Sequence, residues 1–310
     1  MQIVHHASEL HRPERKACLA IGVFDGVHLG HQEVLHQTLR HAADESSLAV
    51  AVTFDRHPST IVAPTRVPPL IYPLSKRLRV IETLGLQAAL VIRFDTEFSR
   101  QPGESFIQNL ATDFGALGSI CVGEDFSFGH QRSGNLSLLH TLGARLNFTA
   151  LGLPPVLLEG TPVSSTRIRD LIRQGDLQAA RAMLGRDYCL AGQVMRGNRL
   201  GTKMGFPTAN LDVKGLILPP NGVYAVRVGV AGTGHQAVMN IGCRPTLGDQ
   251  APEIHAEVHL LDFKGDLYDQ ELEITFRSKL REEQKFANLD ALQTQIREDV
   301  LQARSRLGST

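Results

Sequence analysis

The chain has 310 residues, of which 42% are hydrophobic and 21% are charged, so it is long enough and apolar enough for two globular domains. Lysine and arginine together number 32, as do aspartate and glutamate, and this balance argues against a nucleic-acid-binding protein with a basic field. The four cysteines are widely separated in apolar stretches, no apolar run reaches about 18 residues, and the first residues lack a signal-peptide pattern. These features predict a cytoplasmic protein with reduced thiols that binds neither nucleic acid nor membrane.

The first half of the chain alternates short apolar runs with amphipathic helical patterns. The apolar runs, each of strand length, cover residues 18–24, 48–54, 88–94 and 119–126. Helical periodicity lies between these runs and after the last one, at 31–46, 75–85, 103–115 and 137–146. This alternation predicts βαβ units and a parallel sheet that helices cover on both faces.

The segment GVFDGVHLGH, residues 22–31, connects the first apolar run to the first helical pattern. Parallel sheets bind ligands at the carboxyl ends of their strands, and a helix start offers unpaired N–H groups and the positive end of its dipole. A strand, a glycine-containing turn and a helix start therefore predict a phosphate site. Two alternatives remain for His28 and His31: a turn with a capping histidine, or a metal pair, for which the spacing supplies no third ligand.

A second phosphate site is predicted at VSSTRIRDLIRQGD, residues 163–176. Serine and threonine at the start of a helix leave N–H groups available, and Arg167 and Arg169 add fixed positive charge. The alternative is an ordinary capped helix on the surface. Two such segments in one α/β domain favour nucleotide chemistry more strongly than either does alone.

After about residue 185 the pattern changes to strand-like pieces that glycine, proline and asparagine interrupt, without helical patterns between them. This change predicts an antiparallel barrel or sandwich. The boundary is placed near 183–188, which divides the chain into domains at 1–185 and 186–310. A closing helix is expected after an Asn288 cap, because apolar residues recur at three- and four-residue spacing from Leu289 to Leu307.

Two segments of the second domain carry candidate chemistry. The glycine-rich loop RGNRLGTKMGFPTAN, residues 196–210, has three basic residues and ends in a threonine hydroxyl and an asparagine carbonyl, which are hard oxygen ligands suited to Mg²⁺ with a nucleotide. The alternative is a hairpin loop rich in turn-forming residues. In AEVHLLDF, residues 256–263, alternation puts Glu257 and His259 on one strand face, where the carboxylate is either a surface group or a base.

Short segments along the chain match the motifs of one family in order. GVFDGVHLGH, TFDRHP, VGEDFSFG and SSTRIR resemble its adenylyltransferase motifs, and GFPTAN, GVY, NIGCRPT, EVHLLDF and LREEQKF resemble its flavokinase motifs. Over essentially its whole length, the chain thus resembles the bacterial bifunctional riboflavin kinase/FAD synthetases. The departures are small: Arg56 stands where the family often has proline, and Asp269 stands where glycine usually follows the tyrosine of DLY.

The resemblance implies a Rossmann-like α/β nucleotidyltransferase domain, followed by a mainly antiparallel six-stranded flavokinase β-barrel with a C-terminal helix. It also implies two reactions that use ATP and Mg²⁺. One phosphorylates riboflavin to FMN and releases ADP, and the other adenylylates FMN to FAD and releases pyrophosphate. The expected partners are therefore ATP, riboflavin and FMN, and the expected cofactor is Mg²⁺ with ATP.

The same resemblance implies roles for particular residues. His28 and His31 grip the ATP phosphates and stabilise charge as pyrophosphate leaves. Glu257 is the base that takes the proton of the ribityl hydroxyl, and Thr208 and Asn210 lie at Mg²⁺. The other implied contacts are Gly22, Asp25, Gly30, Ser164, Thr166 and Arg169 for ATP phosphates in the adenylyltransferase, His57 and Asp125 for flavin or nucleotide, and Gly205 for ATP in the kinase.

Two further hypotheses compete with a bifunctional enzyme. In the first, the adenylyltransferase half has decayed and the chain is a riboflavin kinase, but the intact histidine motif and SSTRIR argue against this. In the second, the chain is a non-catalytic flavin- or RNA-binding regulator. Balanced charge and the intact set of Thr208, Asn210 and Glu257 disfavour that hypothesis.

Overall fold

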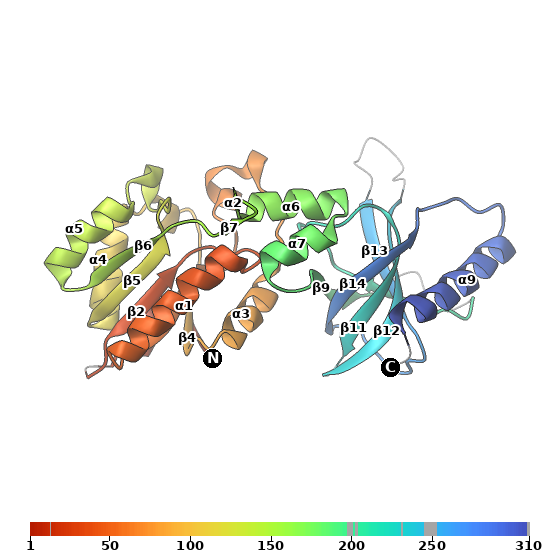
Figure 1. Cartoon of the computed structure of the whole chain (residues 1–310), viewed down its shortest axis with the longest axis horizontal. Coiled ribbons are helices and arrows are strands. Elements are labelled where there is room, and N and C mark those ends of the chain that lie inside the picture. Colours follow the sequence, from red (N-terminus) through yellow and green to blue (C-terminus); the bar gives the residue numbers. More distant parts are fainter. Residues whose placement is uncertain (13, 197–200, 202–203, 231, 245–252, 309–310) are drawn as a thin grey trace. The chain divides into compact units, whose positions relative to one another are not determined.

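The computed structural model of the chain describes residues 1–12, 14–196, 201, 204–230, 232–244 and 253–308. The chain divides into two compact units. The first unit contains Met1–Ile168 and Met183–Gly185, and the second contains Arg169–Ala182 and Arg186–Thr310. Figure 1 labels helices and strands of each unit where there is room.

Within the described residues, six strands form a parallel sheet in the first unit, in the order β1-β4-β3-β2-β5-β6. The strands are β1 (Gln2–Val4), β2 (Ala17–Ile21), β3 (Leu48–Phe54), β4 (Ala88–Ile92), β5 (Leu117–Gly123) and β6 (Thr149–Leu153). The predicted runs correspond to β2, β3, β4 and β5, whose side chains are buried on both faces almost throughout. The prediction of a parallel sheet is confirmed.

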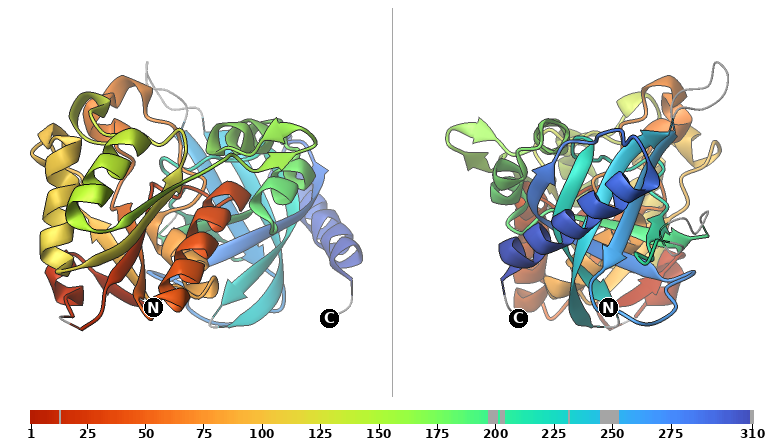
Figure 2. Two further views of the ribbon diagram at one scale, coloured as in Figure 1. Left: turned by 60° about the vertical axis from the view of Figure 1, so that its left-hand side comes forward. Right: turned by 90° about the vertical axis from the view of Figure 1, so that its right-hand side faces the viewer.

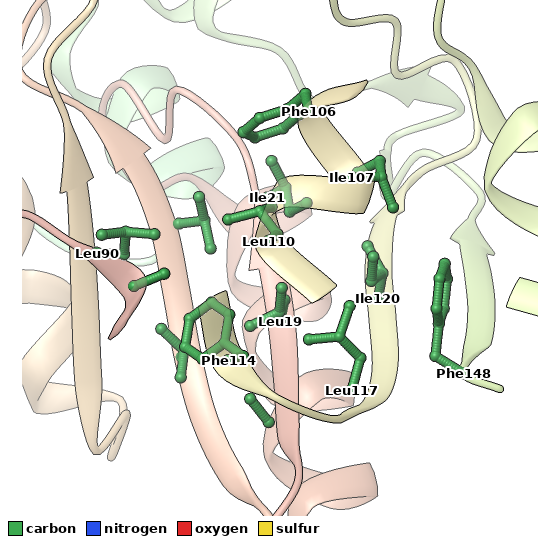
Figure 3. Close-up of a cluster of buried hydrophobic side chains, with 14 of the residues drawn as sticks. Leu19, Ile21, Leu90, Phe106, Ile107, Leu110, Phe114, Leu117, Ile120 and Phe148 are labelled. Carbon is green, nitrogen blue, oxygen red and sulfur yellow. The ribbon is translucent and has the colours of Figure 1, made fainter. Parts of the chain in front are cut away.

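Helices cover both faces of this sheet (Figure 2). The helices are α1 (Leu29–Asp44), α2 (Ser59–Val62), α3 (Leu74–Thr83), α4 (Gly103–Phe114) and α5 (Leu136–Leu146), with 3₁₀ turns at Ala7–Leu10, Pro64–Arg66, Phe98–Arg100 and His130–Arg132. Along β2, Leu19 and Ile21 share a core with side chains of α4, as Figure 3 shows, and also with Leu139 and Leu142 of α5. The alternate residues Cys18 and Ala20 share another core with α1 and α3.

The segment after β6 leads from the first unit into the second. It contains the hairpin of β7 (Leu157–Leu158) and β8 (Thr161–Pro162), then α6 (Ser165–Gln174) and α7 (Leu177–Leu184). Helix α6 begins in the first unit, but from Arg169 onward it groups with the second unit. The end of α7 at Met183–Gly185 groups with the first unit. The domain boundary between 185 and 186 therefore stays a prediction.

In the described part of the second unit, six strands close into an antiparallel barrel in the order β10-β13-β12-β11-β14-β9. The strands are β9 (Cys189–Met195), β10 (Ala209–Leu211), β11 (Gly222–Val230), β12 (Thr233–Arg244), β13 (Glu253–Leu260) and β14 (Glu271–Arg281). The expected barrel is confirmed.

The closing helix α9 (Leu289–Leu307) lies along the outside of the barrel strands (Figure 2). As predicted, Asn288 caps it, and its Oδ1 accepts a hydrogen bond from Ala291 N at 2.9 Å. Ala303 and Leu307 pack in a core with Val223 and Ala225 of β11, whereas Leu289 is exposed. The apolar spacing thus located the helix, although its first residue stays outside the core.

Cys18, Cys121 and Cys189 are buried, as expected for cysteines in apolar stretches, and Cys243 is half-buried. Burial raises the pKa of the Cys121 thiol. Among the residues that the structure describes, every helix falls short of the length or apolarity that a bilayer crossing demands.

Candidate active sites

The start of α1 holds His28 and His31 against each other. His28 is the N-cap residue, and its Nδ1 accepts a hydrogen bond from His31 N at 3.4 Å. The two imidazole rings stack with centroids 3.6 Å apart and planes 18° apart. His28 therefore has the capping geometry that the sequence left open as an alternative, and the same geometry places both imidazoles at the positive end of the helix dipole.

These histidines line a cavity of about 400 Å³ at the carboxyl ends of β2, β5 and β6. Among the residues predicted from the sequence, five line it: Gly22, His28, Gly30, His31 and Asp125. A Cβ added to Gly30 would lie 3.3 Å from the His28 ring, so glycine leaves space beside that imidazole. The cavity thus combines a helix start, two imidazoles and a stretch of backbone that a ligand can approach closely. This arrangement is suited to binding phosphates.

Asp25 is absent from the described residues that line this cavity. Its carboxylate is buried, with both oxygens 3.0 Å from Ile71 N and Oδ1 3.1 Å from Tyr72 N. Its backbone oxygen accepts a hydrogen bond from Ser165 Oγ at 2.9 Å. Asp25 thus links the turn after β2 to two other segments of the unit, and a direct phosphate contact by Asp25 stays a prediction.

Arg77 is a buried residue that sequence reasoning missed. It donates hydrogen bonds to Val23 O at 2.5 Å and to Phe54 O at 3.1 Å, so it fixes the chain just after β2 and at the end of β3. Burial lowers the pKa of its guanidinium, and the carboxylates of Asp25 and Asp55 partly offset that effect. In the sequence, Arg77 is indistinguishable from a solvent-facing residue of an amphipathic helix.

The predicted residues of α6 are placed differently from the histidines. Ser164 Oγ accepts a hydrogen bond from Arg167 N at 3.3 Å, as a helix cap does. Thr166 is exposed, and Arg169 is buried and groups with the second unit. Among the described residues, Val163 is the one from this segment that lines the histidine cavity. The phosphate contacts expected of Ser164, Thr166 and Arg169 stay predictions.

A larger cavity of about 570 Å³ adjoins the first, because Val23, Phe126 and Ser127 line both. Six of the 13 phenylalanines of the chain line it: Phe54, Phe94, Phe98, Phe106, Phe126 and Phe128. Neighbouring rings contact one another with centroids 5.4 to 6.1 Å apart. We call it the aromatic cavity. No periodic pattern in the sequence predicts this cavity, because its residues come from several strands, helices and loops.

His57 lies beside the aromatic cavity rather than among the described residues that line it. Its Nδ1 accepts a hydrogen bond from Ser59 N at 3.2 Å, and the next residue, Pro58, lines the cavity. Arg56, the first departure from the family motif, pairs with Asp55 at 2.9 Å. Partial burial raises the pKa of Asp55, but hydrogen bonds from Arg56 and from Phe94 N outweigh burial and lower that pKa overall.

Three of the four residues predicted for the kinase site, Thr208, Asn210 and Glu257, line a cavity of about 320 Å³ between barrel strands and α9, and Gly205 is absent from the described residues that line it. Thr208 Oγ1 donates a hydrogen bond to Glu257 Oε2 at 3.4 Å. Glu257 on β13 is paired with Asn210 on β10 and with Asn240 on β12. The Glu257 carboxylate therefore lies beside two amides and a hydroxyl, and all four side chains line the cavity.

This donor set fits Mg²⁺ carried by a nucleotide. Mg²⁺ prefers oxygen ligands and is usually held by one or two carboxylates together with phosphates and water. The described residues contain no cluster of three or more histidine, cysteine, aspartate or glutamate side chains suited to a metal. Thr208 and Asn210 are consequently suited to a cation whose other ligands come from ATP, with the Glu257 carboxylate beside them.

His259 supports the segment that carries Thr208. Its Nδ1 lies 2.8 Å from Pro207 O, and its ring meets that of Phe206 edge-on at 5.6 Å. Because a carbonyl oxygen can only accept, the hydrogen must be on Nδ1. The sequence placed His259 on the same face as Glu257, and both do line the cavity.

The glycine-rich loop is described in part. Residues 197–200 and 202–203 lie outside the described residues, as does the end of NIGCRPT. Gly205 has a φ of 84°, in the left-handed region that glycine tolerates. Asp269, the second departure from the family, has a φ of 61°, which explains why glycine suits that position.

Comparisons with known proteins agree with this arrangement. A family model described as FAD synthetase matches residues 10–167, and one described as riboflavin kinase matches residues 184–307. A bifunctional riboflavin kinase/FMN adenylyltransferase of Pseudomonas fluorescens is 37% identical over 306 residues, covering 98% of this chain and 97% of that protein. The protein of the same name from Haemophilus influenzae is 35% identical over 311 residues, covering 100% of both chains.

A solved structure is also similar. It is titled a macrolide-efflux protein from Streptococcus pneumoniae, is 26% identical in sequence and has a TM-score of 0.79. The similarity covers 97% of this chain and 98% of that one. The arrangement of the α/β unit followed by the barrel therefore recurs in a second chain of nearly the same extent.

Proposed function

The chain belongs to the family of bifunctional riboflavin kinase/FMN adenylyltransferases, and we propose how its residues divide the two reactions. The flavokinase part converts riboflavin to FMN, and the FAD synthetase part converts FMN to FAD. One observation supports the residue assignments: each unit contains its own polar cluster. The first unit has the stacked pair of His28 and His31, and the second has Glu257 with Thr208.

In the adenylyltransferase, His28 and His31 bind the ATP phosphates. An oxygen of the FMN phosphate attacks the α-phosphorus of ATP, a new P–O bond forms, and the bond to pyrophosphate breaks. The FMN phosphate is already a nucleophile, so the reaction needs no strong base. It needs alignment and stabilisation of the negative charge on the leaving group, which the imidazoles and the start of α1 are suited to supply.

The aromatic cavity is the proposed site for the isoalloxazine ring of FMN. Its volume of about 570 Å³ falls within the range of ligand pockets, and its phenylalanine walls suit a flat aromatic ring. Because it shares Val23, Phe126 and Ser127 with the histidine cavity, a flavin bound there directs its phosphate toward ATP. Asp125 and His57 flank these cavities and remain proposed flavin or nucleotide contacts.

In the kinase, Glu257 accepts the proton of the ribityl hydroxyl as that oxygen attacks the γ-phosphorus of ATP and ADP leaves. Thr208, Asn210 and Gly205 bind ATP, and Thr208 and Asn210 hold its Mg²⁺. When bound, Mg²⁺ neutralises negative charge on the phosphates. The hydrogen bond between Thr208 and Glu257 supports this assignment, because it brings the predicted base next to a predicted cation ligand.

We also propose the domain bounds, three further contacts with ATP, the location of the enzyme and its partners. The domains are residues 1–185 and 186–310, and Ser164, Thr166 and Arg169 contact ATP phosphates. The enzyme works in the cytoplasm on ATP, riboflavin and FMN, and its partners include neither nucleic acid nor membrane. Apolar placement of the cysteines and the balanced charge support this last proposal.

A time course tests the division of labour. The protein is incubated with riboflavin, ATP and Mg²⁺, and FMN and FAD are resolved chromatographically. FMN should appear first and FAD after it, and omission of Mg²⁺ should stop both. Absence of ATP turnover with riboflavin would favour the non-catalytic regulator instead.

A further inference from the structure

The passage between the two cavities of the first unit is marked by Ser127. Of the three described residues that line both cavities, Ser127 alone has a polar side chain; the others are Val23 and Phe126. Ser127 Oγ accepts a hydrogen bond from Arg132 Nε at 3.0 Å. The Arg132 guanidinium, which itself lines the aromatic cavity, therefore lies beside this passage.

The guanidinium has donors to spare. The bond to Ser127 uses Nε, which leaves the N–H groups of Nη1 and Nη2. Within the described part of the chain, no carboxylate forms an ion pair with Arg132, although surface arginines elsewhere, such as Arg40 and Arg145, pair with glutamates. Arg132 is thus an anchored cation at the edge of an otherwise mostly apolar cavity, in the geometry that binds an anion through two parallel hydrogen bonds.

The loop that carries Arg132 has an unusual backbone. Gln131 and Arg132 have φ angles of 54° and 60°, in the left-handed region that non-glycine residues rarely adopt. Phe128 and Gly134 pair across the base of the loop through hydrogen bonds of 3.0 and 2.9 Å. A Cβ added to Gly103 would lie 2.8 Å from Gly134, so the loop packs directly on the start of α4. Such strain is typical of segments that present a side chain to a ligand.

We propose that Arg132 binds the 5′-phosphate of FMN and so makes the adenylyltransferase distinguish FMN from riboflavin. The proposal rests on the proposed function, because it requires the flavin ring in the aromatic cavity. Riboflavin and FMN share the ring and the ribityl chain, so an apolar cavity binds both alike. They differ in the phosphate, and a cation at the passage attracts that phosphate but finds no corresponding group on riboflavin.

The selectivity for FMN over riboflavin matters because one chain carries both activities. Riboflavin is the substrate of the kinase and FMN is its product, so both flavins are present together. Without recognition of the phosphate, riboflavin would occupy the adenylyltransferase as an inhibitor. Arg132 would also offset repulsion between the FMN phosphate and the ATP phosphates while the attacking oxygen approaches the α-phosphorus.

Arg100 provides a matched control. It is an arginine that lines the same cavity, but it is absent from the described residues that line the histidine cavity, and it has no bond to Ser127. The experiment uses the full chain and measures FAD formation from FMN for Arg132→Gln, Arg132→Lys and Arg100→Gln. The neutral probe is 5′-deoxyriboflavin, which lacks the hydroxyl that the kinase phosphorylates, used as a competitive inhibitor of FAD formation.

Arg132→Gln should raise the KM for FMN by about 10- to 100-fold, the usual effect of losing charge-assisted hydrogen bonds. The inhibition constant of 5′-deoxyriboflavin should change by less than about twofold, since that probe has no phosphate. Arg132→Lys should give an intermediate KM, because it keeps the charge without the bidentate geometry. Arg100→Gln alters the wall of the aromatic cavity but not the passage, so it should change the constants for FMN and for 5′-deoxyriboflavin by the same factor.

Equal weakening of FMN and 5′-deoxyriboflavin in Arg132→Gln would overturn the proposal, as would a selective loss for FMN in Arg100→Gln instead. Riboflavin phosphorylation, measured on the same preparations, reports whether the other active site is intact, and Arg132→Lys covers the case in which the glutamine variant misfolds.

Phe98→Ala separately tests the premise that the flavin ring binds in the aromatic cavity. It should weaken both flavins alike, and if it affects neither, the proposed location of the flavin fails and Arg132 fails with it.

Discussion

Arg281 and Asp299 form a two-point ion pair between β14 and α9. Arg281 Nε lies 2.8 Å from Asp299 Oδ1, and Nη2 lies 2.8 Å from Oδ2. Gln295 Nε2 adds a third hydrogen bond to Asp299 Oδ1 at 3.2 Å, and the aspartate side chain is only 3% exposed. Because Leu292 and Ile296 of the same helix line the kinase cavity, this pair fixes one wall of that site.

Asp299→Asn should destabilise the second unit by about 2–4 kcal/mol, because it leaves the half-buried Arg281 without its counter-charge. Riboflavin phosphorylation should be lost at a lower temperature than FAD formation from supplied FMN. Urea unfolding and the two activities measure these effects. The matched control is Asp262→Asn, which removes an exposed partner of Arg304 and should cost less than about 1 kcal/mol. Equal destabilisation by both variants would contradict the role given to Asp299.

The fold follows from local patterns where burial is complete. The run at 48–54 predicted β3 to the residue, because every second side chain faces one of two cores and the intervening ones face the other. The three-residue strand β1 (Gln2–Val4) left no such signal, since a run that short has no measurable period. The capped helix α9 was predictable because Asn288 and the apolar spacing both lie within a single segment.

The candidate sites were predictable as motifs but not as contacts. His28 with His31, and Thr208 with Asn210, lie within a few residues of each other, so spacing alone brings them together. Asp25 belongs to the first motif, yet its carboxylate bonds to Ile71 and Tyr72, which are 46 and 47 residues away. The aromatic cavity depends on phenylalanines from residue 54 to residue 128, and no local pattern predicts that they converge.

His28→Ala with His31→Ala should abolish FAD formation while FMN formation continues. Loss of one preorganised donor typically costs about 10²–10³ in rate, so the double change is severe. Product analysis with riboflavin, ATP and Mg²⁺ measures both reactions at once. An equal fall in FMN production would contradict the assignment of these histidines to adenylyl transfer.

His28→Asn separates catalysis from capping. Asparagine is among the best N-cap residues, so it preserves the start of α1 without the imidazole. We expect this variant to keep its thermal stability and still lose FAD formation by about 10²-fold. Normal FAD formation by His28→Asn would show that capping is the whole role of His28.

His259→Asn and His259→Gln should differ in kinase activity. The amide nitrogen of asparagine falls near the position of Nδ1, whereas that of glutamine falls near Nε2. Asparagine can therefore still donate to Pro207 O and hold the segment before Thr208. We expect His259→Gln to raise the KM for ATP by about tenfold, the upper end for one lost hydrogen bond, and His259→Asn to raise it by less than about threefold. Identical kinetics for the two variants would argue that the bond to Pro207 does not position Thr208.

A fragment of residues 186–310 should phosphorylate riboflavin without the rest of the chain. A fragment of residues 169–310 should also be active, and its Tm should be higher. Asp187 bridges α7 and the barrel, with its carboxylate 3.2 Å from Arg181 Nε and 2.7 Å from Arg277 Nη1. Residues 169–182 group with the second unit, so the longer fragment keeps this bridge. Thermal unfolding and kinase assays compare the two. Inactivity of both fragments beside an active full chain would count against a separable kinase.

Glu257→Gln should nearly eliminate riboflavin phosphorylation and leave FAD synthesis from supplied FMN intact. Glutamine keeps the size of glutamate and can still accept a hydrogen bond from Thr208, so folding and ATP binding should persist. It cannot take the proton of the ribityl hydroxyl, and general-base assistance is usually worth about 10²–10⁴ in rate. Steady-state rates of FMN and FAD formation measure the two outcomes.

Thr208→Ala is the matched control, because it removes the other end of the same hydrogen bond. It should slow the kinase through Mg²⁺ and ATP, so raising Mg²⁺ should recover part of its rate, whereas the Glu257→Gln defect should not respond to Mg²⁺ or ATP. Removal of a general base should reduce turnover by at least about 100-fold. If Glu257→Gln keeps more than about a tenth of normal turnover, the loss is smaller than that and Glu257 is not the base. The carboxylates of Glu283 and Asp299 line the same cavity. Because Asp299 forms an ion pair with Arg281, Glu283 is then the next carboxylate to test.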